Sequence, residues 1–154
     1  MPRPSASAVM ATAVGGAIAI ACLALATSQA NLSFIMAHFG ASCVLLFSVP
    51  ASPLSQPENV IGGHLQSTFV GLVLTAVLPN VWWAVALAAG LAIALMAALR
   101  VTHPPAGANP LVIFAADPGF LFLLFPVLSV AVALVAIATI YHRLSGTTFP
   151  LDPS

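Results

Sequence analysis

The chain has 154 residues, of which 61% are hydrophobic and only 4% are charged. In a soluble domain about a quarter of the residues are charged, so this chain could not cover itself with a polar surface and is predicted to be a membrane protein. The formal net charge is zero, which excludes electrostatic binding of nucleic acid. Arg3, Arg100 and Arg143 are its only strongly basic residues.

The first apolar run, residues 9–26, follows Arg3 and is followed by Ser28, Gln29 and Ala30, a pattern that also occurs in cleaved secretory signals. The run is long for such a signal, and adjacent glycines at 15 and 16 suit close packing of membrane helices. We expect it to be retained as a transmembrane helix after a short tail at residues 1–8.

Three further runs, residues 60–78, 81–99 and 120–141, are long enough to cross the hydrocarbon core as helices. Pro79 and Asn80 predict a tight turn that makes the first two of these antiparallel neighbours. Trp82 and Trp83 are typical of side chains anchored at a membrane interface, and His142 with Arg143 is expected to anchor the other end.

Two more apolar segments, residues 32–49 and 104–116, are interrupted by polar residues, glycine or proline. The sequence therefore predicts an all-α polytopic membrane protein. We expect a small bundle of four full transmembrane helices plus two interrupted, half-helix segments. They form one domain over residues 9–143, with a tail at residues 144–154.

The two interrupted segments resemble each other, because GASCVLLF at residues 40–47 aligns without a gap with GANPLVIF at residues 107–114. This indicates an internal repeat of residues 9–78 and 81–143, with chance resemblance in an Ala-, Leu- and Val-rich chain as the alternative. If both interrupted segments cross the membrane, all three arginines lie on one side, as the positive-inside rule favours. Re-entrant segments would put Arg100 on the opposite side. Six crossings make the halves an inverted repeat with a cytoplasmic N-terminus.

The repeated motif predicts two helix starts inside the membrane. Ser and Asn are preferred N-caps, and Pro110 after Asn109 is a favoured first helical residue. We expect Ser42 and Asn109 each to begin a half-helix after extended chain, with Gly40 and Gly107 allowing close backbone approach. Helix N-termini carry partial positive charge and free N–H groups, which bind anions. Packing kinks without a ligand are the alternative.

His103 stands at the head of the proline-broken segment, and His64 lies within an apolar helix. An ionisable residue inside a membrane indicates function by default, although a hydrogen-bonded structural histidine explains His64 equally well. His38 is a weaker candidate for the same cavity. The predicted substrate-binding residues are Gly40, Ala41, Ser42, His64, His103, Pro104, Pro105, Gly107, Ala108 and Asn109. Motifs for metals, cofactors or catalysis do not occur, so we expect no cofactor and no enzymatic activity.

The stretch from Thr102 to Pro110, THPPAGANP, resembles the signature of the HPP family of integral membrane proteins. Residues 39–42 and 52–64 resemble the same family. It is usually described with four transmembrane segments, and members from chloroplasts and cyanobacteria are associated with nitrite transport. The resemblance implies a transporter or channel for a small inorganic anion, with nitrite as the leading substrate, in the cell inner (plasma) membrane.

Two other functions stay open at this point. Glycine and alanine faces would also serve a non-transporting scaffold or assembly subunit, and a membrane-embedded enzyme would need two convergent titratable groups. For the transporter, the expected partners are a small anion and the lipid bilayer. A homo-oligomer is expected because one protomer forms only a small bundle.

Overall fold

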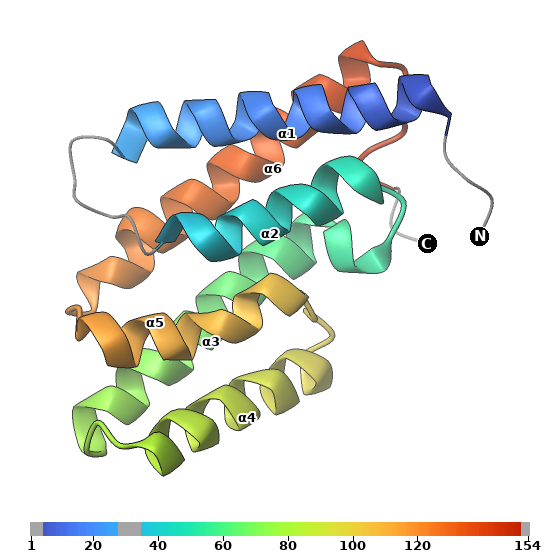
Figure 1. The fold of residues 1–154 in the computed structure, drawn as a ribbon. Helices are drawn as coiled ribbons and strands as arrows, with labels where there is room; N and C mark the ends of the chain where they lie inside the picture. The colour runs from blue at the N-terminus through green and yellow to red at the C-terminus, as the bar shows by residue number, and fades with distance from the viewer. Residues whose placement is uncertain (1–4, 28–34, 152–154) are drawn as a thin grey trace.

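The computed structural model describes residues 5–27 and 35–151 of the chain. Within them all regular structure is helical, which confirms the predicted all-α class (Figure 1). The α-helices are α1 (Ala6–Thr27), α2 (Ile35–Ser48), α3 (Pro57–Val77), α4 (Trp82–Ala98), α5 (Asn109–Ala116) and α6 (Ser129–Leu144). Short helical segments precede three of them, namely η1 (Pro53–Ser55) before α3, η2 (Pro104–Ala108) before α5 and η3 (Leu123–Leu128) before α6.

Three stretches are long and apolar enough to cross a membrane, namely Ala6–Leu25, Pro57–Val77 and Leu123–Leu144. The helix α4 is also apolar and has 17 residues, which lies at the lower end of the length that crosses the hydrocarbon core. Large apolar side chains cover the outside, as shown by Trp82 at 82% and Leu121 at 73% exposure. Such a surface suits lipid rather than water.

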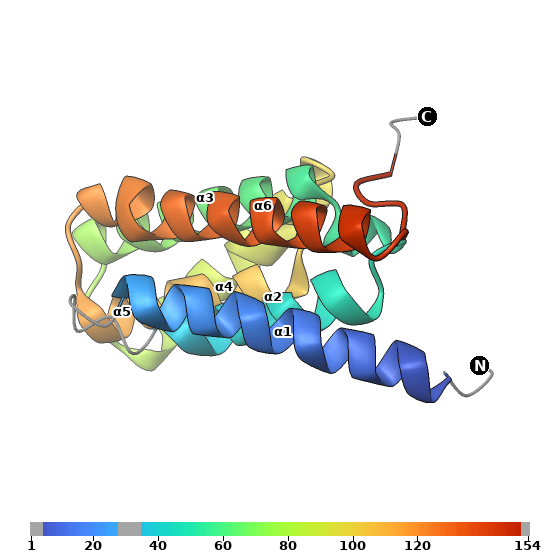
Figure 2. The same ribbon diagram turned by 90° about the horizontal axis from the view of Figure 1, so that it is seen from above.

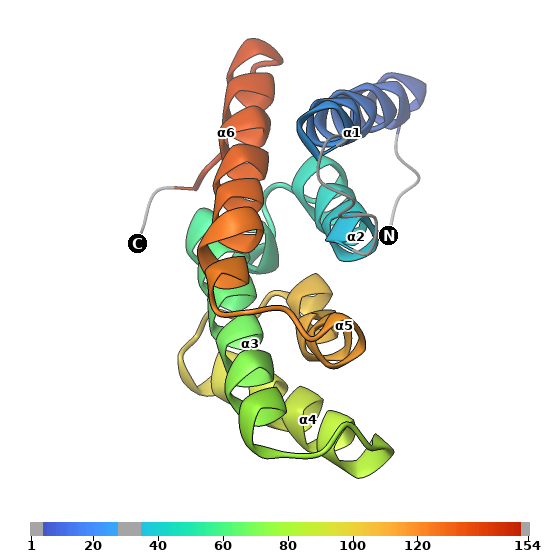
Figure 3. The same ribbon diagram turned by 90° about the vertical axis from the view of Figure 1, so that its left-hand side faces the viewer.

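The helices form two layers (Figure 3). One layer is a row in the order α1, α2, α5 and α4, and the other consists of α3 and α6, which lie across this row (Figures 1 and 3). Seen from above, α6 and α3 lie on one side of the molecule and α1 on the other (Figure 2). The two interrupted segments, α2 and η2–α5, therefore lie in the middle of the row, and α3 packs against both η2 and α5.

The six α-helices of the described residues run in alternating directions, so the start of α1 and the ends of α4 and α6 lie at the same end (Figure 1). We call this the arginine end, because Arg143 lies in the last turn of α6 and Arg100 follows α4. This placement agrees with the six-segment arrangement. Arg3 and the possible cleavage motif at residues 28–30 lie outside the described residues.

The proline-broken segment, which comprises η2 and α5 together with His103 before them, packs against a face of small residues on α3. A Cβ atom added at Gly63 would lie 2.8 Å from the Cβ of His103, and one added at Gly71 would lie 3.1 Å from the Cα of Pro110. Between them, the Ser67 hydroxyl donates to the Ala106 carbonyl at 2.7 Å. Spacing of four residues places these three α3 residues on one face, which fixes the depth of η2 and α5.

The predicted role of Gly40 and Gly107 in close backbone approach is wrong. In the described part of the chain, nothing lies within 4 Å of a Cβ built at Gly40, and only Ile93 at 3.9 Å approaches one built at Gly107. The close approaches occur on α3 instead, and also on α1, where a Cβ at Gly15 would meet Phe47 at 2.5 Å. The neighbouring Gly16 is open.

Carbonyl groups in the last turn of α2 accept hydrogen bonds from side chains of three other elements. A helix end leaves up to four carbonyls without intrahelical partners, which must be paired when water is excluded. The donors are Ser55 to Leu45 at 3.2 Å, His142 to Leu46 at 2.8 Å and Thr12 to Phe47 at 3.0 Å. This short helix is therefore fixed at one height in the bundle.

Candidate functional site

A cluster of buried polar side chains lies where α2, α3, the segment before η2 and the start of α5 meet. Its members are Ser42, His64, Thr68, His103 and Asn109, and we call it the polar cluster. All are fully buried except Asn109, which is 2% exposed. Three of the elements are separated by long stretches of chain, so the cluster is a product of tertiary packing.

The hydrogen bonds of His103 fix the position of its ring proton. Its Nδ1 lies 2.8 Å from the carbonyl oxygen of Leu54, and its Nε2 lies 2.8 Å from the hydroxyl of Ser42. A carbonyl can only accept, so Nδ1 carries the hydrogen. In a neutral ring Nε2 is then an acceptor, and the Ser42 hydroxyl donates to it. The hydroxyl's contact with the His38 carbonyl is longer, at 3.2 Å.

The same reasoning continues through Ser42 to His64. Since the Ser42 hydroxyl has one hydrogen and gives it to His103, its oxygen accepts from Nε2 of His64 at 3.1 Å. Nδ1 of a neutral His64 then carries no hydrogen, and it lies 3.2 Å from the amide nitrogen and 3.3 Å from the amide oxygen of Asn109. The cluster therefore contains a directed chain of hydrogen bonds that runs from His64 through Ser42 and His103 to the Leu54 carbonyl.

Asn109 lies beside the His64 end of this hydrogen-bond chain and is itself held by contacts to α3. Its amide nitrogen donates to the Thr68 hydroxyl at 2.7 Å and to the His64 carbonyl at 3.0 Å. Thr68 was not among the predicted site residues. The signal was present, because Thr68 follows His64 by four residues and must share its helix face.

The prediction that Asn109 caps a helix is wrong. Asn109 has helical backbone angles, φ −57° and ψ −44°, and its side chain crosses to α3 instead of its own helix. The chain before it is also not extended, because Pro104–Ala108 forms the short helix η2. The prediction that α5 is a short helix starting at Asn109 is confirmed.

The prediction that Ser42 starts a half-helix is also wrong. The helix α2 is continuous over Ile35–Ser48, and Ser42 lies in its middle. Its side chain still reaches the polar cluster, because the helix presents that face to α3 and to the segment before η2.

Few backbone N–H groups are free at the start of η2. Pro104 and Pro105 have none, and the N–H of Ala106 already donates to the His103 carbonyl at 3.0 Å. The expectation of an anion held by free N–H groups at the head of this segment is therefore corrected. Side-chain donors of the polar cluster are what a ligand would meet.

The remaining predicted residues lie beside the cluster rather than in it. Ala41, Pro104 and Pro105 line an open apolar hollow of about 430 Å³ on the seam between α2 and η2. Gly40 lines a different hollow, between α1 and α2. Gly107 and Ala108 lie in η2 and are only partly buried.

His38 lies next to the cluster on α2. Its side chain is 6% exposed, and its ring centroid is 5.6 Å from that of His64. Its Nε2 is buried and has no partner among the described residues. Three imidazoles therefore come within one small region, since the rings of His64 and His103 are 5.1 Å apart.

The buried polar side chains of the described residues are all His, Ser, Thr, Asn or Gln. Neither a carboxylate nor an arginine is buried in the part of the chain that the structure covers. The described residues also hold no group of three His, Cys, Asp or Glu side chains that could bind a metal ion. The polar cluster is therefore uncharged unless a histidine is protonated.

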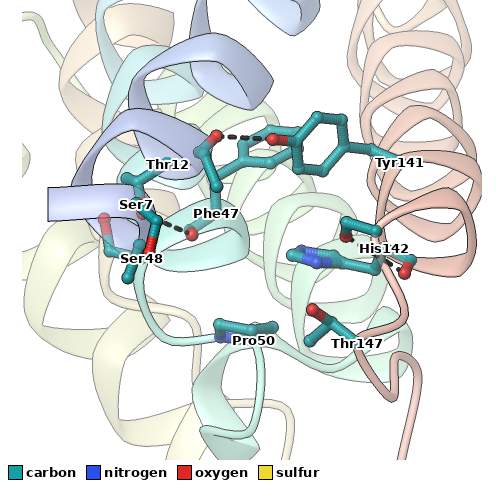
Figure 4. Close-up of a pocket in the computed structure, with 11 residues that line it drawn as sticks. Ser7, Thr12, Phe47, Ser48, Pro50, Tyr141, His142 and Thr147 are labelled. Atoms are coloured by element: carbon teal, nitrogen blue, oxygen red, sulfur yellow. Dashed lines mark hydrogen bonds between the residues drawn. The ribbon is translucent and has the colours of Figure 1, made fainter. Parts of the chain in front are cut away.

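A separate pocket of about 380 Å³ lies at the arginine end between α1, α2 and α6 (Figure 4). Thr12, Ser48, Tyr141 and Thr147 contribute polar groups to it. The prediction of His142 as an interfacial anchor is wrong, because it is only 3% exposed and donates into the bundle. None of the predicted site residues lines this pocket.

Comparison with known proteins agrees with this membrane architecture. The model of the HPP family, described as its transmembrane region, matches residues 1–150. Two transmembrane proteins of Dictyostelium discoideum are 36% and 34% identical to the chain, which covers 46% and 40% of their respective lengths. These matches cover 80% and 76% of the chain, which thus spans less than half of these curated relatives. No solved structure matches. The chain is a membrane protein that belongs to the HPP family.

Proposed function

We propose that this protein transports a small monovalent anion, with nitrite as the leading substrate, across the inner (plasma) membrane. The observation that carries the proposal is the polar cluster, a buried set of N–H and O–H groups without a buried carboxylate. Polar groups inside a membrane are costly, and they are usually found along substrate pathways. The arginine end would face the cytoplasm, together with the N-terminus.

The chemistry of the cluster suits a planar, weakly basic anion. Such an anion needs only a few donors, and the amide of Asn109 and the hydroxyl of Thr68 lie at one place beside His64. A fixed arginine would hold the anion more tightly, whereas conduction requires binding that is weak enough for release.

Two features support a pathway between the halves of the chain. Each half contains a short apolar helix, α2 or α5, and these lie side by side in the row, as in transporters built from inverted repeats. Arg100 is exposed at the arginine end, where a positive charge would raise the local concentration of anions. We propose the inverted 3+3 repeat and a homo-oligomer as part of the same hypothesis.

The test is flux into proteoliposomes that contain the purified protein. Nitrite uptake should exceed that in protein-free vesicles, and urea, a neutral solute of similar size, should show no such excess. Equal protein-dependent flux of both solutes, or no protein-dependent flux of either, would overturn the proposal.

A second candidate function rests on the contact between Ser42 and His103. Their 2.8 Å separation is that of a nucleophile and a general base, and the nearby His64 supplies a second titratable group. An enzyme would therefore label at Ser42 with a fluorophosphonate probe in the membrane. A transporter needs no nucleophile, and its Ser42 should stay unlabelled.

A further inference from the structure

We infer that the polar cluster takes up one proton with each anion, so that transport is electroneutral co-transport of a proton and an anion. The inference rests on the proposed function of anion transport. It follows from three properties of the cluster, which are its lack of fixed charge, the direction of its hydrogen bonds and its position along α3.

The first property is the lack of fixed charge. An isolated anion moved into a buried, uncharged site loses its hydration without gaining a counter-charge, which is strongly unfavourable. The titratable groups that face the cluster are His64 from α3, His103 from the segment before η2 and His38 from α2. The parts of η1 and α5 that face it supply the Leu54 carbonyl and the Asn109 amide, which do not titrate. In the described residues, a positive charge can arise here only by protonation of a histidine.

The second property is the direction of the hydrogen bonds, which leaves one ring nitrogen ready to take a proton. Nδ1 of His64 carries no hydrogen and lies beside Asn109, where the anion would bind. A proton that arrives with the anion forms an N–H bond there and makes His64 an imidazolium. The anion and the imidazolium then form a neutral pair.

The chain also lets two imidazoles share this proton. The Nε2–H bond of His64 breaks as a new O–H bond forms on Ser42, and the original O–H bond of Ser42 breaks as an N–H bond forms at Nε2 of His103. One proton is gained in total, and the positive charge moves from His64 to His103. No redox change and no further reactant are needed.

The third property is the position of this hydrogen-bond chain along α3. His64 is seven residues from the start of α3, about 10 Å from the arginine end at 1.5 Å per residue, and Thr68 lies deeper. The hydrogen-bond chain ends at the Leu54 carbonyl in η1, in the connection between α2 and α3. Transfer from His64 to His103 therefore moves the positive charge toward the arginine end.

The decisive experiment follows nitrite uptake and luminal pH together in proteoliposomes, after subtraction of protein-free vesicles. We expect one proton to enter with each nitrite, and an imposed membrane potential to leave the initial rate unchanged. Nitrite uptake that responds to potential and leaves the lumen at its starting pH would overturn the proton inference and leave anion transport intact. The absence of protein-dependent nitrite uptake would instead overturn the proposed function.

A pair of serine variants tests the route of the proton. Ser42→Ala breaks the chain between the two imidazoles and should abolish the stimulation of nitrite uptake by an inward proton gradient. Ser67→Ala removes an equally buried hydroxyl one turn from His64 that donates to the Ala106 carbonyl instead, and it should retain this stimulation. Loss of stimulation in both variants, or in neither, would refute the role of Ser42.

A measurement on the unmodified protein keeps the inference testable if Ser42→Ala fails to fold. Nitrogen-15 NMR of the imidazoles should show hydrogen on Nδ1 of His103 and on Nε2 of His64 without nitrite. With saturating nitrite, one imidazolium should appear in the cluster. Neutral rings throughout, in protein that still transports nitrite, would overturn the inference.

Discussion

The close approach of α3 to the proline-broken segment leads to a quantitative prediction for Gly63→Ala. The new Cβ would lie 2.8 Å from the Cβ of His103 and 2.9 Å from the carbonyl oxygen of Val101. Carbon atoms in contact prefer about 3.5–4.0 Å, so either α3 or the segment before η2 must move. The Val101 oxygen belongs to the backbone, and the His103 Cβ is attached directly to it. Rotation of a side chain therefore cannot relieve the contact.

The expected cost follows from two opposing effects. Forced overpacking of a core costs about 1–3 kcal/mol, and replacing a helical glycine by alanine returns up to about 1 kcal/mol. We therefore expect a net loss of about 1–2 kcal/mol, a factor of about 5–30 in the ratio of folded to unfolded protein. Any shift of His103 also lengthens its 2.8 Å bond to Ser42, so proton-stimulated uptake should fall as well.

Gly90→Ala is the matched control, because nothing in the described structure lies within 4 Å of a Cβ built there on α4. It should gain the helix propensity without the clash. The assay is the midpoint for loss of monodisperse protein on heating in detergent, followed by nitrite flux in proteoliposomes. A Gly63→Ala protein as stable as Gly90→Ala, with unchanged proton stimulation, would show that the contact between α3 and His103 is not tight.

Three further variants test other parts of the structure. Asn109→Leu leaves the Thr68 hydroxyl without its donor, so we expect the free energy of unfolding to fall by about 1–3 kcal/mol. The variant should still insert into the membrane but lose nitrite flux. If the protein is a scaffold, the same variant would lose its assembly or show no effect. His142→Ala removes the donor to the Leu46 carbonyl and should lower the melting midpoint by the equivalent of about 2–4 kcal/mol, while flux per folded protein is retained. Asp117→Gly should raise the midpoint by the equivalent of about 0.5–1 kcal/mol, because Asp117 has a left-handed φ of 43°.

The helices themselves could be predicted from the sequence because the membrane imposes a simple rule. Backbone groups in lipid must be satisfied internally, so an apolar run of sufficient length becomes a helix whatever its neighbours are. The predicted runs at residues 9–26 and 60–78 correspond closely to α1 and α3. The helix α4 is shorter than the predicted run at residues 81–99, but the predicted turn at Pro79 and Asn80 before it is present.

The two repeated motifs show where sequence reasoning failed and why. Gly-Ala-Ser and Gly-Ala-Asn look equivalent, yet α2 continues through Ser42 whereas α5 begins at Asn109. The difference lies in the prolines, since three of them surround the second motif and α2 contains none. Glycine and serine only weaken a helix, whereas proline removes a donor and clashes with the preceding turn. Motif similarity therefore did not predict equal structure.

The contacts of the polar cluster could not be predicted, because they join residues far apart in the chain. Ser42 and His103 are separated by 61 positions, and His64 and Asn109 by 45. The sequence showed which residues were unusual in an apolar chain, and the individual candidates at these four positions do meet. The order of the hydrogen bonds depends on angles and distances that only the packing of α2, α3 and η2 decides.

The prolines connect the break in the chain to the proposed proton dependence. A helix that starts in a membrane without prolines offers several backbone N–H groups, which bind an anion at any pH. Pro104 and Pro105 lack these groups, and the next N–H is already bonded to the His103 carbonyl. In the proposed transporter, recognition then falls to side chains, and among the described residues of the cluster only the histidines can become positive. An anion site of this kind gains affinity only as it gains a proton, so anion binding should weaken as pH rises.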